Sequence, residues 1–247
     1  MNLEEFINLK RPNLSISSVK TYTSILSNLL KKVYGNKDFS LDKLNDSTKI
    51  LEFLKDYTPN RRKTILSALV ITTQLPEYRT LMMEDSSNYA NQIATQVKTK
   101  KQEENTITQQ ELHDLLKKHK NIATKIYKKE FITSKDYQDI QDYILLALFS
   151  GFYIIPRRSL DYISMKISNI DKSEDNYMDG NELVFQKFKT AKSKGIQRIK
   201  IPITLKNILK KWKNKNPTDY LLFNNKMKPL TSATMTQKFN RLFGNRN

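Results

Sequence analysis

The chain has 247 residues, with 43 lysines and arginines against 25 aspartates and glutamates, and a net charge of +18. A hydrophobic content of 38% predicts a folded protein rather than a disordered one. The absence of cysteine excludes disulfides and thiolate metal sites and favours an intracellular protein. The first residues lack the pattern of a signal peptide, and the longest apolar run, 144–155, is too short to span a bilayer, so no membrane partner is expected.

Most of the net charge lies in the last quarter of the chain. Residues 186–247 hold 16 basic residues and one acidic residue, Asp219, a net charge of +15, whereas residues 1–185 have a net charge of only +3. A basic surface this concentrated predicts a polyanionic partner, and nucleic acid is the favoured one. A general bias toward lysine is the alternative, but it would spread lysine evenly along the chain.

The first hundred residues predict an all-helical domain. Apolar residues recur at helical spacing in 15–32, 41–57 and 59–70, and a further helix is expected across 77–97. Pro59 opens the third of these helices, where its missing N–H costs nothing. The first turn of that helix is basic and contains Arg61, Arg62 and Lys63.

A charged segment without apolar residues divides this domain from the rest of the chain. It predicts domains at 1–97 and 107–247, with a linker at 98–106. Thr108 and Glu111 then have the spacing of a capping box, which predicts the start of a helix. A second helix, from about Tyr137 to Ser150, is apolar nearly all round and is expected to be buried.

The hydrophobic period changes from helical to strand-like beyond residue 181. Ile199, Ile201 and Ile203 alternate with Arg198, Lys200 and Pro202, which is typical of a half-buried strand paired in a hairpin. Helical spacing returns after this strand, and the last helix is expected over 232–243. The expected fold is therefore mainly α-helical, with a small antiparallel sheet in the second domain.

Between the buried helix and the hairpin lie Pro156, Arg157 and Arg158. Proline is favoured in the first turn of a helix, so this segment predicts a helix start at which a phosphate is favoured. Adjacent helical residues diverge by about 100°, so one of the two arginines would point at a given phosphate. Taken alone, the same residues are also typical of two surface arginines in a basic protein.

The stretch 143–202 resembles the first half of the catalytic domain of tyrosine recombinases, the phage-integrase class of DNA strand-transfer enzymes. Arg158-Ser-Leu-Asp161 matches the family's Arg-x-x-Glu/Asp motif after a buried helix. The resemblance implies that Arg158 is catalytic and that Asp161 supports it structurally. The usual Gly-x-Arg spacing is stretched after Gly151, which keeps Arg157 as a rival. The variant IPRRSLDY looks like integrases of large DNA viruses and mobile elements.

The resemblance also implies a general acid on the hairpin. Lys189 stands where the family has the lysine that protonates the leaving 5′-hydroxyl, with Lys192 and Lys194 as rivals. The first domain resembles the family's helical, SAM-like core-binding domain, which holds duplex DNA together with the catalytic domain. The residues expected to contact DNA are Arg61, Arg62, Lys63, Lys187, Lys192, Lys194, Arg198 and Lys200.

Two elements of the family's active site do not occur in this sequence. The histidines, His113 and His119, are not followed by an arginine three residues on, and the last tyrosine, Tyr220, precedes the position expected for the nucleophile. We therefore expect a catalytic domain that is incomplete for strand cleavage on its own. No cofactor or metal is expected, because two histidines spaced six apart make a poor metal site.

These features predict a protein of DNA integration or site-specific recombination that binds double-stranded DNA and self-associates on it. The alternative is a non-catalytic duplex-DNA-binding module that occupies recombination or regulatory sites. A basic RNA-binding protein is less favoured, because the chain has no RNP-like aromatic strand motif.

Overall fold

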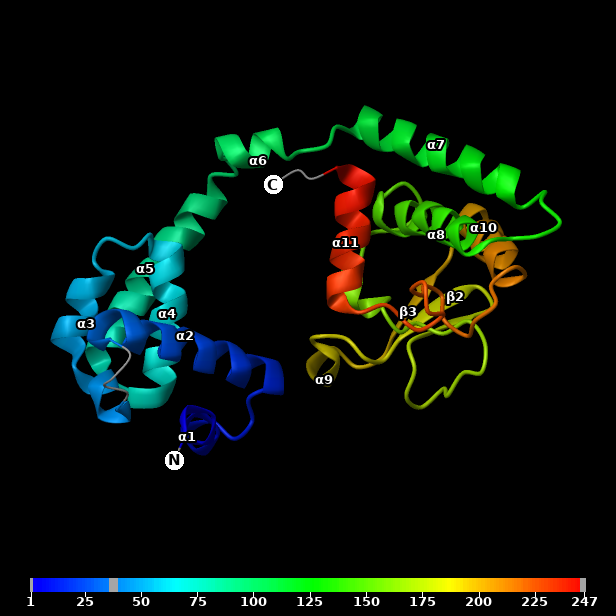
Figure 1. Ribbon diagram of the computed structural model, residues 1–247. Helices are drawn as coiled ribbons and strands as arrows, with labels where there is room; N and C mark the ends of the chain where they lie inside the picture. Colours follow the sequence, from blue (N-terminus) through cyan, green and yellow to red (C-terminus); the bar gives the residue numbers. More distant parts are fainter. Residues whose placement is uncertain (1, 36–39, 245–247) are drawn as a thin grey trace. The chain divides into compact units, whose positions relative to one another are not determined.

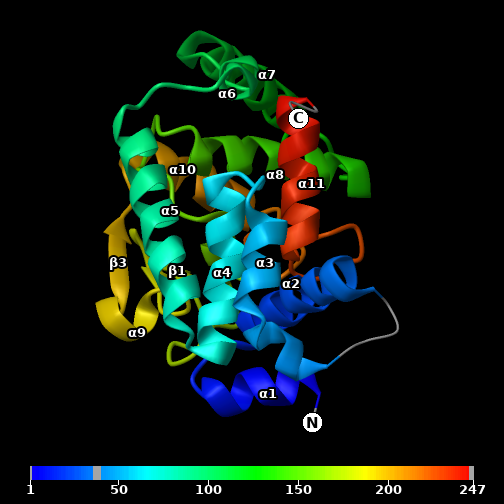
Figure 2. The same cartoon turned by 90° about the vertical axis from the view of Figure 1, so that its left-hand side faces the viewer.

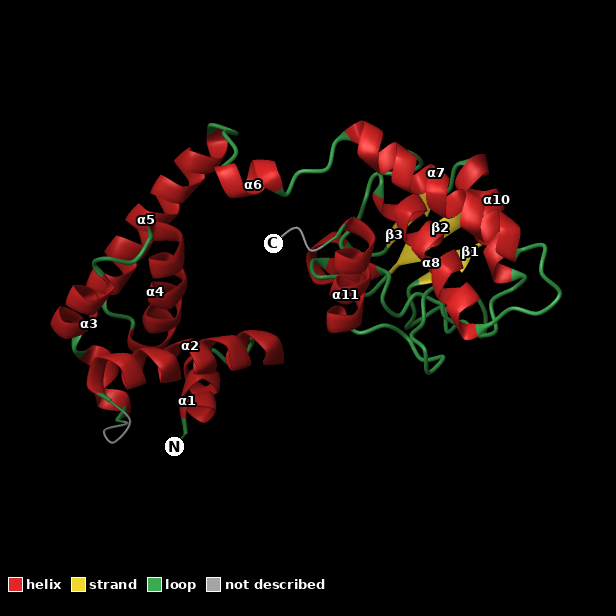
Figure 3. Ribbon diagram, turned by 45° about the horizontal axis from the view of Figure 1, so that its top comes forward, coloured by secondary structure: helices red, strands yellow, loops and turns green. Residues whose placement is uncertain are grey.

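The computed structural model of the chain describes residues 2–35 and 40–244. The chain divides into two compact units, Met1–Lys98 and Thr99–Asn247, and each unit has its own hydrophobic core. Helices dominate both units, and the strands among the described residues lie in the second unit (Figures 1 and 3). The expected mainly helical fold with a small antiparallel sheet is confirmed.

The first unit consists of helices, and its described residues contain no strand. Its elements are α1 (Leu3–Lys10), α2 (Ile16–Tyr34), the 3₁₀ helix η1 (Leu41–Asn45), α3 (Ser47–Leu54), α4 (Pro59–Thr73) and α5 (Pro76–Ala94). Ser15 caps α2 by accepting the N–H of Ser18, and prolines occupy the first turns of α4 and α5. α4 and α5 lie side by side (Figure 2).

Two features of the first unit differ from the sequence-based expectation. The helix expected over 41–57 is divided into η1 and α3. The reason is Asp46, whose ψ of 73° is not helical and whose side chain accepts the N–H of Lys49 at 3.1 Å, which starts a new helix. The second feature is α1, a helix additional to those expected. A capping box between Asn2 and Glu5 begins it.

The second unit contains the longer helices α7 (Gln109–Ile126), α8 (Ser134–Phe149), α10 (Ile203–Lys213) and α11 (Ser232–Phe243), and the short helices α6 (Lys100–Glu104), η2 (Ser159–Asp161) and α9 (Ala191–Lys194). The predicted capping box of Thr108 and Glu111 begins α7. α8 begins slightly earlier than expected, because Thr133 and Asp136 form another capping box. α6 falls inside the expected linker and buries no residue.

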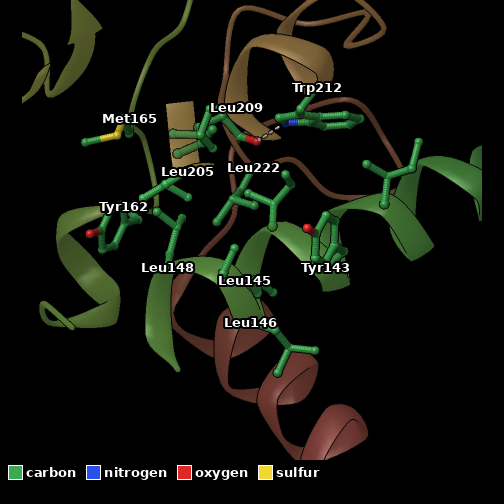
Figure 4. Packing of buried hydrophobic residues seen from close by; sticks show 14 of the residues in the cluster. Tyr143, Leu145, Leu146, Leu148, Tyr162, Met165, Leu205, Leu209, Trp212 and Leu222 are labelled. Carbon is green, nitrogen blue, oxygen red and sulfur yellow. Dashed lines mark hydrogen bonds between the residues drawn. The ribbon is translucent and has the colours of Figure 1, made fainter. Parts of the chain in front are cut away.

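α8 forms the centre of the second core. As its sequence predicts, it is buried nearly all round, from Ile140 to Leu148. Figure 4 shows Leu145 and Leu148 on the side of α8 near Leu205 and Leu209 of α10, and the indole N–H of Trp212 donates to the carbonyl of Leu221 at 2.8 Å. This packing fixes the position at which the chain leaves α8 and enters the arginine-containing loop.

The sheet is a three-stranded antiparallel meander of β1 (Tyr177–Asp179), β2 (Glu182–Phe185) and β3 (Gln197–Lys200), in that order. Phe185 pairs with Gln197 at the loop end of the β2–β3 hairpin. The strand expected through Ile203 ends at Lys200, because Pro202 has no N–H to donate and caps α10 instead. Ile203 is 68% exposed, so its expected inward position is wrong. In residues 2–35 and 40–244 we find no helix with the length and apolar content of a bilayer span.

Candidate nucleic-acid interface

The loop after α8 carries the two candidate arginines, and it is not the helix start that the sequence predicts. Pro156 and Arg157 lie in irregular chain, and Arg158 precedes η2, a single 3₁₀ turn. A three-residue turn has neither a macrodipole nor a set of free N–H groups large enough to bind a phosphate. Phosphate binding here would therefore depend on side chains. The expectation failed because proline suits an extended loop as well as a helix start.

Arg157 is held by polar contacts on two sides of its guanidinium. Its Nε donates to Oδ2 of Asp161 at 3.1 Å, and its Nη1 donates to Oε1 of Gln197 at 2.7 Å. Asp161 lies in η2 and is 4% exposed, while Gln197 begins β3. The carboxylate that the resemblance assigns to structural support therefore orients Arg157 in this structure.

Aromatic rings complete the support of this guanidinium. Cζ of Arg157 lies 4.1 Å from the ring centre of Phe185 and 5.2 Å from that of Phe188. A guanidinium has five N–H donors, and the two described hydrogen bonds leave three of them available. A planar cation fixed in this way has lost its rotamer freedom before a ligand arrives, which favours bidentate binding of a phosphate.

Arg158 has a different environment. It is exposed, and it donates no hydrogen bond to the described part of the chain. An exposed arginine must lose rotamer freedom when it binds, so it contributes less per contact than a pre-oriented one. Of the two arginines that the sequence offers as phosphate ligands, Arg157 is therefore the pre-oriented one.

Three candidate lysines lie in the loop that joins β2 to β3, residues 186–196, which we call the hairpin tip, and all three are exposed. Lys189 directly follows Phe188, whose ring contacts Arg157, whereas Lys192 and Lys194 lie on the short helix α9. Gly195 ends α9 with a φ of 64°, a conformation that glycine adopts without strain. Of these lysines, Lys189 is therefore the one next in the chain to a residue that contacts the Arg157 guanidinium.

The other predicted DNA-contacting residues of the hairpin are Lys187, Arg198 and Lys200, and two of them pair with carboxylates. Lys187 forms an ion pair with Glu174 at 2.7 Å, and that hydrogen bond raises the pKa of the lysine. Arg198 pairs with Glu182 at 3.0 Å. Because side chains alternate along a strand, Arg198 and Lys200 lie on the opposite face of the sheet from Gln197. The structure therefore does not bring all the predicted cations onto one surface.

In the first unit two of the basic residues of α4, Arg61 and Arg62, have different environments. Arg62 binds the carboxylate of Asp85 bidentately, at 2.8 Å from Nε and 2.7 Å from Nη2, and the Asp85 side chain is 1% exposed. This guanidinium is already paired inside the fold, where it neutralises a buried carboxylate, and its expected contact with DNA stays a prediction. Cζ of Arg61 lies 4.4 Å from the ring centre of Tyr57, and Arg61 is exposed.

A cavity of about 570 Å³ in the first unit was not evident from the sequence. Lys32 from α2, Tyr57, and Arg61 and Asn60 from the first turn of α4 line it. Lysine, arginine and amide side chains beside a tyrosine ring suit a phosphate next to a base or sugar. The basic first turn of α4 was the available signal for this cavity in the sequence. Lys32 of α2 joins it only through tertiary packing, which the sequence does not reveal.

The two histidines do not form part of a metal site in this structure. His113 is exposed and packs edge-on against Phe152, and His119 is half-buried, with burial lowering its pKa. Among residues 2–35 and 40–244 there is no group of three or more side chains suited to holding a metal ion.

No protein-family model matches the chain, and no curated protein matches it. Among solved structures, it is similar to the crystal structure of XerA recombinase, with a TM-score of 0.33 and 13% sequence identity, over 99% of this chain and 75% of that one.

Proposed function

We propose that the chain is a duplex-DNA-binding protein of the tyrosine-recombinase type, acting in DNA integration or site-specific recombination. The observation that carries the proposal is the guanidinium of Arg157, fixed between Asp161 and Gln197 beside a lysine-rich hairpin tip. The charge of +15 over residues 186–247 supports a polyanionic partner. The motif resemblance, which favours Arg158 and keeps Arg157 as its rival, implies a phosphate site in this segment.

In this proposal Arg157 binds the phosphate and Asp161 positions it. Arg158 contacts DNA from an exposed position and contributes less. Lys189 is the proposed general acid, because it is exposed and directly follows Phe188, whose ring contacts Arg157, and its ammonium can donate a proton to the leaving oxygen. Arg61 and Lys63 contribute backbone contacts from the first unit, and Arg62 stabilises that unit.

The second candidate is a non-catalytic module that occupies the same class of DNA site. The position of Tyr220 favours it. Tyr220 pairs with Lys166, and Lys166 pairs with Tyr177 of β1, so Tyr220 lies beyond the edge of the sheet opposite β3. Arg157 contacts Phe185 of β2 and Gln197 of β3, which lie three and four inter-strand steps from the backbone of Tyr220, roughly 14–19 Å along the sheet. That separation exceeds the length of a tyrosine side chain, which argues against Tyr220 as the nucleophile for a phosphate bound at Arg157.

Duplex DNA should bind with an affinity that depends strongly on salt, because each phosphate neutralised releases counterions. The logarithm of the binding constant is expected to fall linearly with the logarithm of salt concentration, by about 0.9 per phosphate contacted. Fluorescence anisotropy with a labelled duplex measures it. A flat response between low and moderate salt, or a clear preference for single-stranded RNA, contradicts the proposal.

Residues 1–247 are expected to bind a nicked duplex without forming a covalent protein–DNA adduct. The physical reason is the position of Tyr220, since nucleophilic attack requires a hydroxyl in line with the leaving oxygen at about 3–3.5 Å. End-labelled DNA on denaturing gels gives the readout. If a protease-sensitive shifted band forms with these residues and disappears in Tyr220→Phe, the non-catalytic reading is wrong.

A further inference from the structure

A second basic surface lies in the second unit, on α7 and α10, and the proposed DNA interface does not use it. The second half of α7 and the turn after it, residues 115–129, contain six lysines and no acidic residue. α10 and the segment after it, residues 203–218, contain five lysines and no acidic residue. We call the lysines of these two stretches the α7–α10 surface. All of them are exposed except Lys206, which is half-buried.

A cavity between the two helices shows that their lysines reach one surface. It has a volume of about 190 Å³, and its lining includes residues of both helices: Lys120, Thr124, Asn207 and Lys211. Nζ of Lys211 lies 4.8 Å from the ring centre of Tyr127, at the end of α7. Lys117 precedes Lys120 by three residues and therefore lies on the same side of α7. α7 and α10 thus present lysines side by side to solvent.

The charges of this surface are almost entirely without acidic partners. Within residues 2–35 and 40–244, the one ion pair that these lysines form with a carboxylate joins Lys129 to Asp136, at 2.6 Å. On α8, by contrast, Lys135 pairs with Asp139 one turn away at 2.6 Å, which is typical of a solvated helix. Like charges concentrated on neighbouring helices repel one another, and a polyanion relieves that repulsion.

The dimensions of the α7–α10 surface fit a nucleic-acid duplex. From Lys117 to Lys125 the axis of α7 rises roughly 12 Å, a length over which a duplex carries about seven phosphate charges. The exposed amide of Asn207 adds a donor of the kind that contacts phosphate and sugar. Figure 1 shows α9, the helix of the hairpin tip, and α10 on opposite sides of the second unit. A duplex held at Arg157 and the hairpin tip therefore leaves the α7–α10 surface free.

We propose that the α7–α10 surface binds the phosphate backbone of a second duplex, separate from the one proposed at Arg157. Binding depends on charge and not on base sequence, because lysines that contact phosphates carry no sequence information. The chain then holds two duplexes at once. This inference goes beyond the proposed function and does not use Arg157, so the two proposals can fail separately.

The test titrates the full chain at low salt with an excess of labelled duplex, about two helical turns long. Sedimentation velocity counts the duplexes per chain, and the wild type should bind two. The variant Lys117→Gln/Lys120→Gln/Lys211→Gln should weaken one binding step about tenfold or more. The salt dependence of that step should become shallower by about 2.7, three phosphate contacts at about 0.9 each. Arg157→Gln should weaken the other step alone.

The matched control is Lys100→Gln/Lys101→Gln/Lys226→Gln, which removes the same charge from three exposed lysines outside the surface. Both binding steps should stay within about twofold of the wild type. Equal losses in the control and in the surface variant overturn the proposal, because net charge alone then explains them.

Two further results decide between the proposals. A wild type that binds a single duplex, weakened by both Arg157→Gln and the surface variant, means that one duplex contacts both places, which overturns the second site and leaves the proposed function standing. Two steps, of which the surface variant weakens one and Arg157→Gln weakens neither, contradict the role of Arg157 and support the α7–α10 surface.

Discussion

Arg62→Met is expected to destabilise the first unit by about 3–5 kcal/mol, the cost of leaving a buried carboxylate without its partner. The Asp85 side chain is 1% exposed, and both of its oxygens accept from Arg62. The same guanidinium donates to the carbonyl of Lys55 at 3.3 Å, so its loss also loosens the end of α3. Urea unfolding measures the change in the free energy of unfolding, and an unchanged m-value shows that the change is one of stability.

Arg61→Met is the matched control for this prediction. It removes the same charge from the neighbouring residue, which is exposed and stacks on Tyr57, so the expected loss is below about 1 kcal/mol. The double variant Arg62→Met/Asp85→Leu should recover most of the stability, because no charge is then left buried. A loss below about 1 kcal/mol for Arg62→Met would return Arg62 to the group of DNA-contacting residues.

Arg157→Gln is expected to weaken duplex binding by about 1.5–3 kcal/mol, roughly 10- to 150-fold, the value of a charge-assisted hydrogen bond. Glutamine removes the positive charge but keeps an amide donor for the buried carboxylate of Asp161, which limits damage to the fold. Anisotropy at fixed salt gives the affinity, and the melting temperature shows whether the variant remains folded.

Arg158→Gln makes the same change of charge one residue further on, and its loss of affinity should be clearly smaller. The reason is that Arg158 is exposed and lacks the support that fixes Arg157. Equal and small losses in the two variants would support two ordinary surface arginines. A larger loss in Arg158→Gln would restore the assignment that the sequence motif favours.

Local signals in the sequence predicted the helices well. Capping residues such as Thr108 with Glu111, and prolines such as Pro59, mark helix starts through contacts within a few residues, so the sequence alone contains them. The buried helix α8 was evident from its continuous apolar composition. α11 has the expected bounds, Ser232–Phe243, because its apolar residues recur at helical spacing and Gly244 ends the helix.

The functional residues were harder to predict, because their environments depend on distant parts of the chain. Gln197 is 40 residues from the arginine that it binds, and Asp85 is 23 residues from Arg62. Neither pairing leaves a local pattern. The motif could narrow the choice to Arg157 or Arg158, but only the hydrogen bonds of Arg157 with Asp161 and Gln197 distinguish the two.

The salt dependence of duplex binding, compared between the wild type and Arg157→Gln, tests the central claim most directly. If Arg157 holds a phosphate, the slope of log binding constant against log salt concentration should become shallower by about 0.9 in the variant, the contribution of one phosphate contact. An affinity lost without a change in slope would mean that Arg157 acts through the fold. Identical affinities and slopes would contradict the claim that this guanidinium binds DNA.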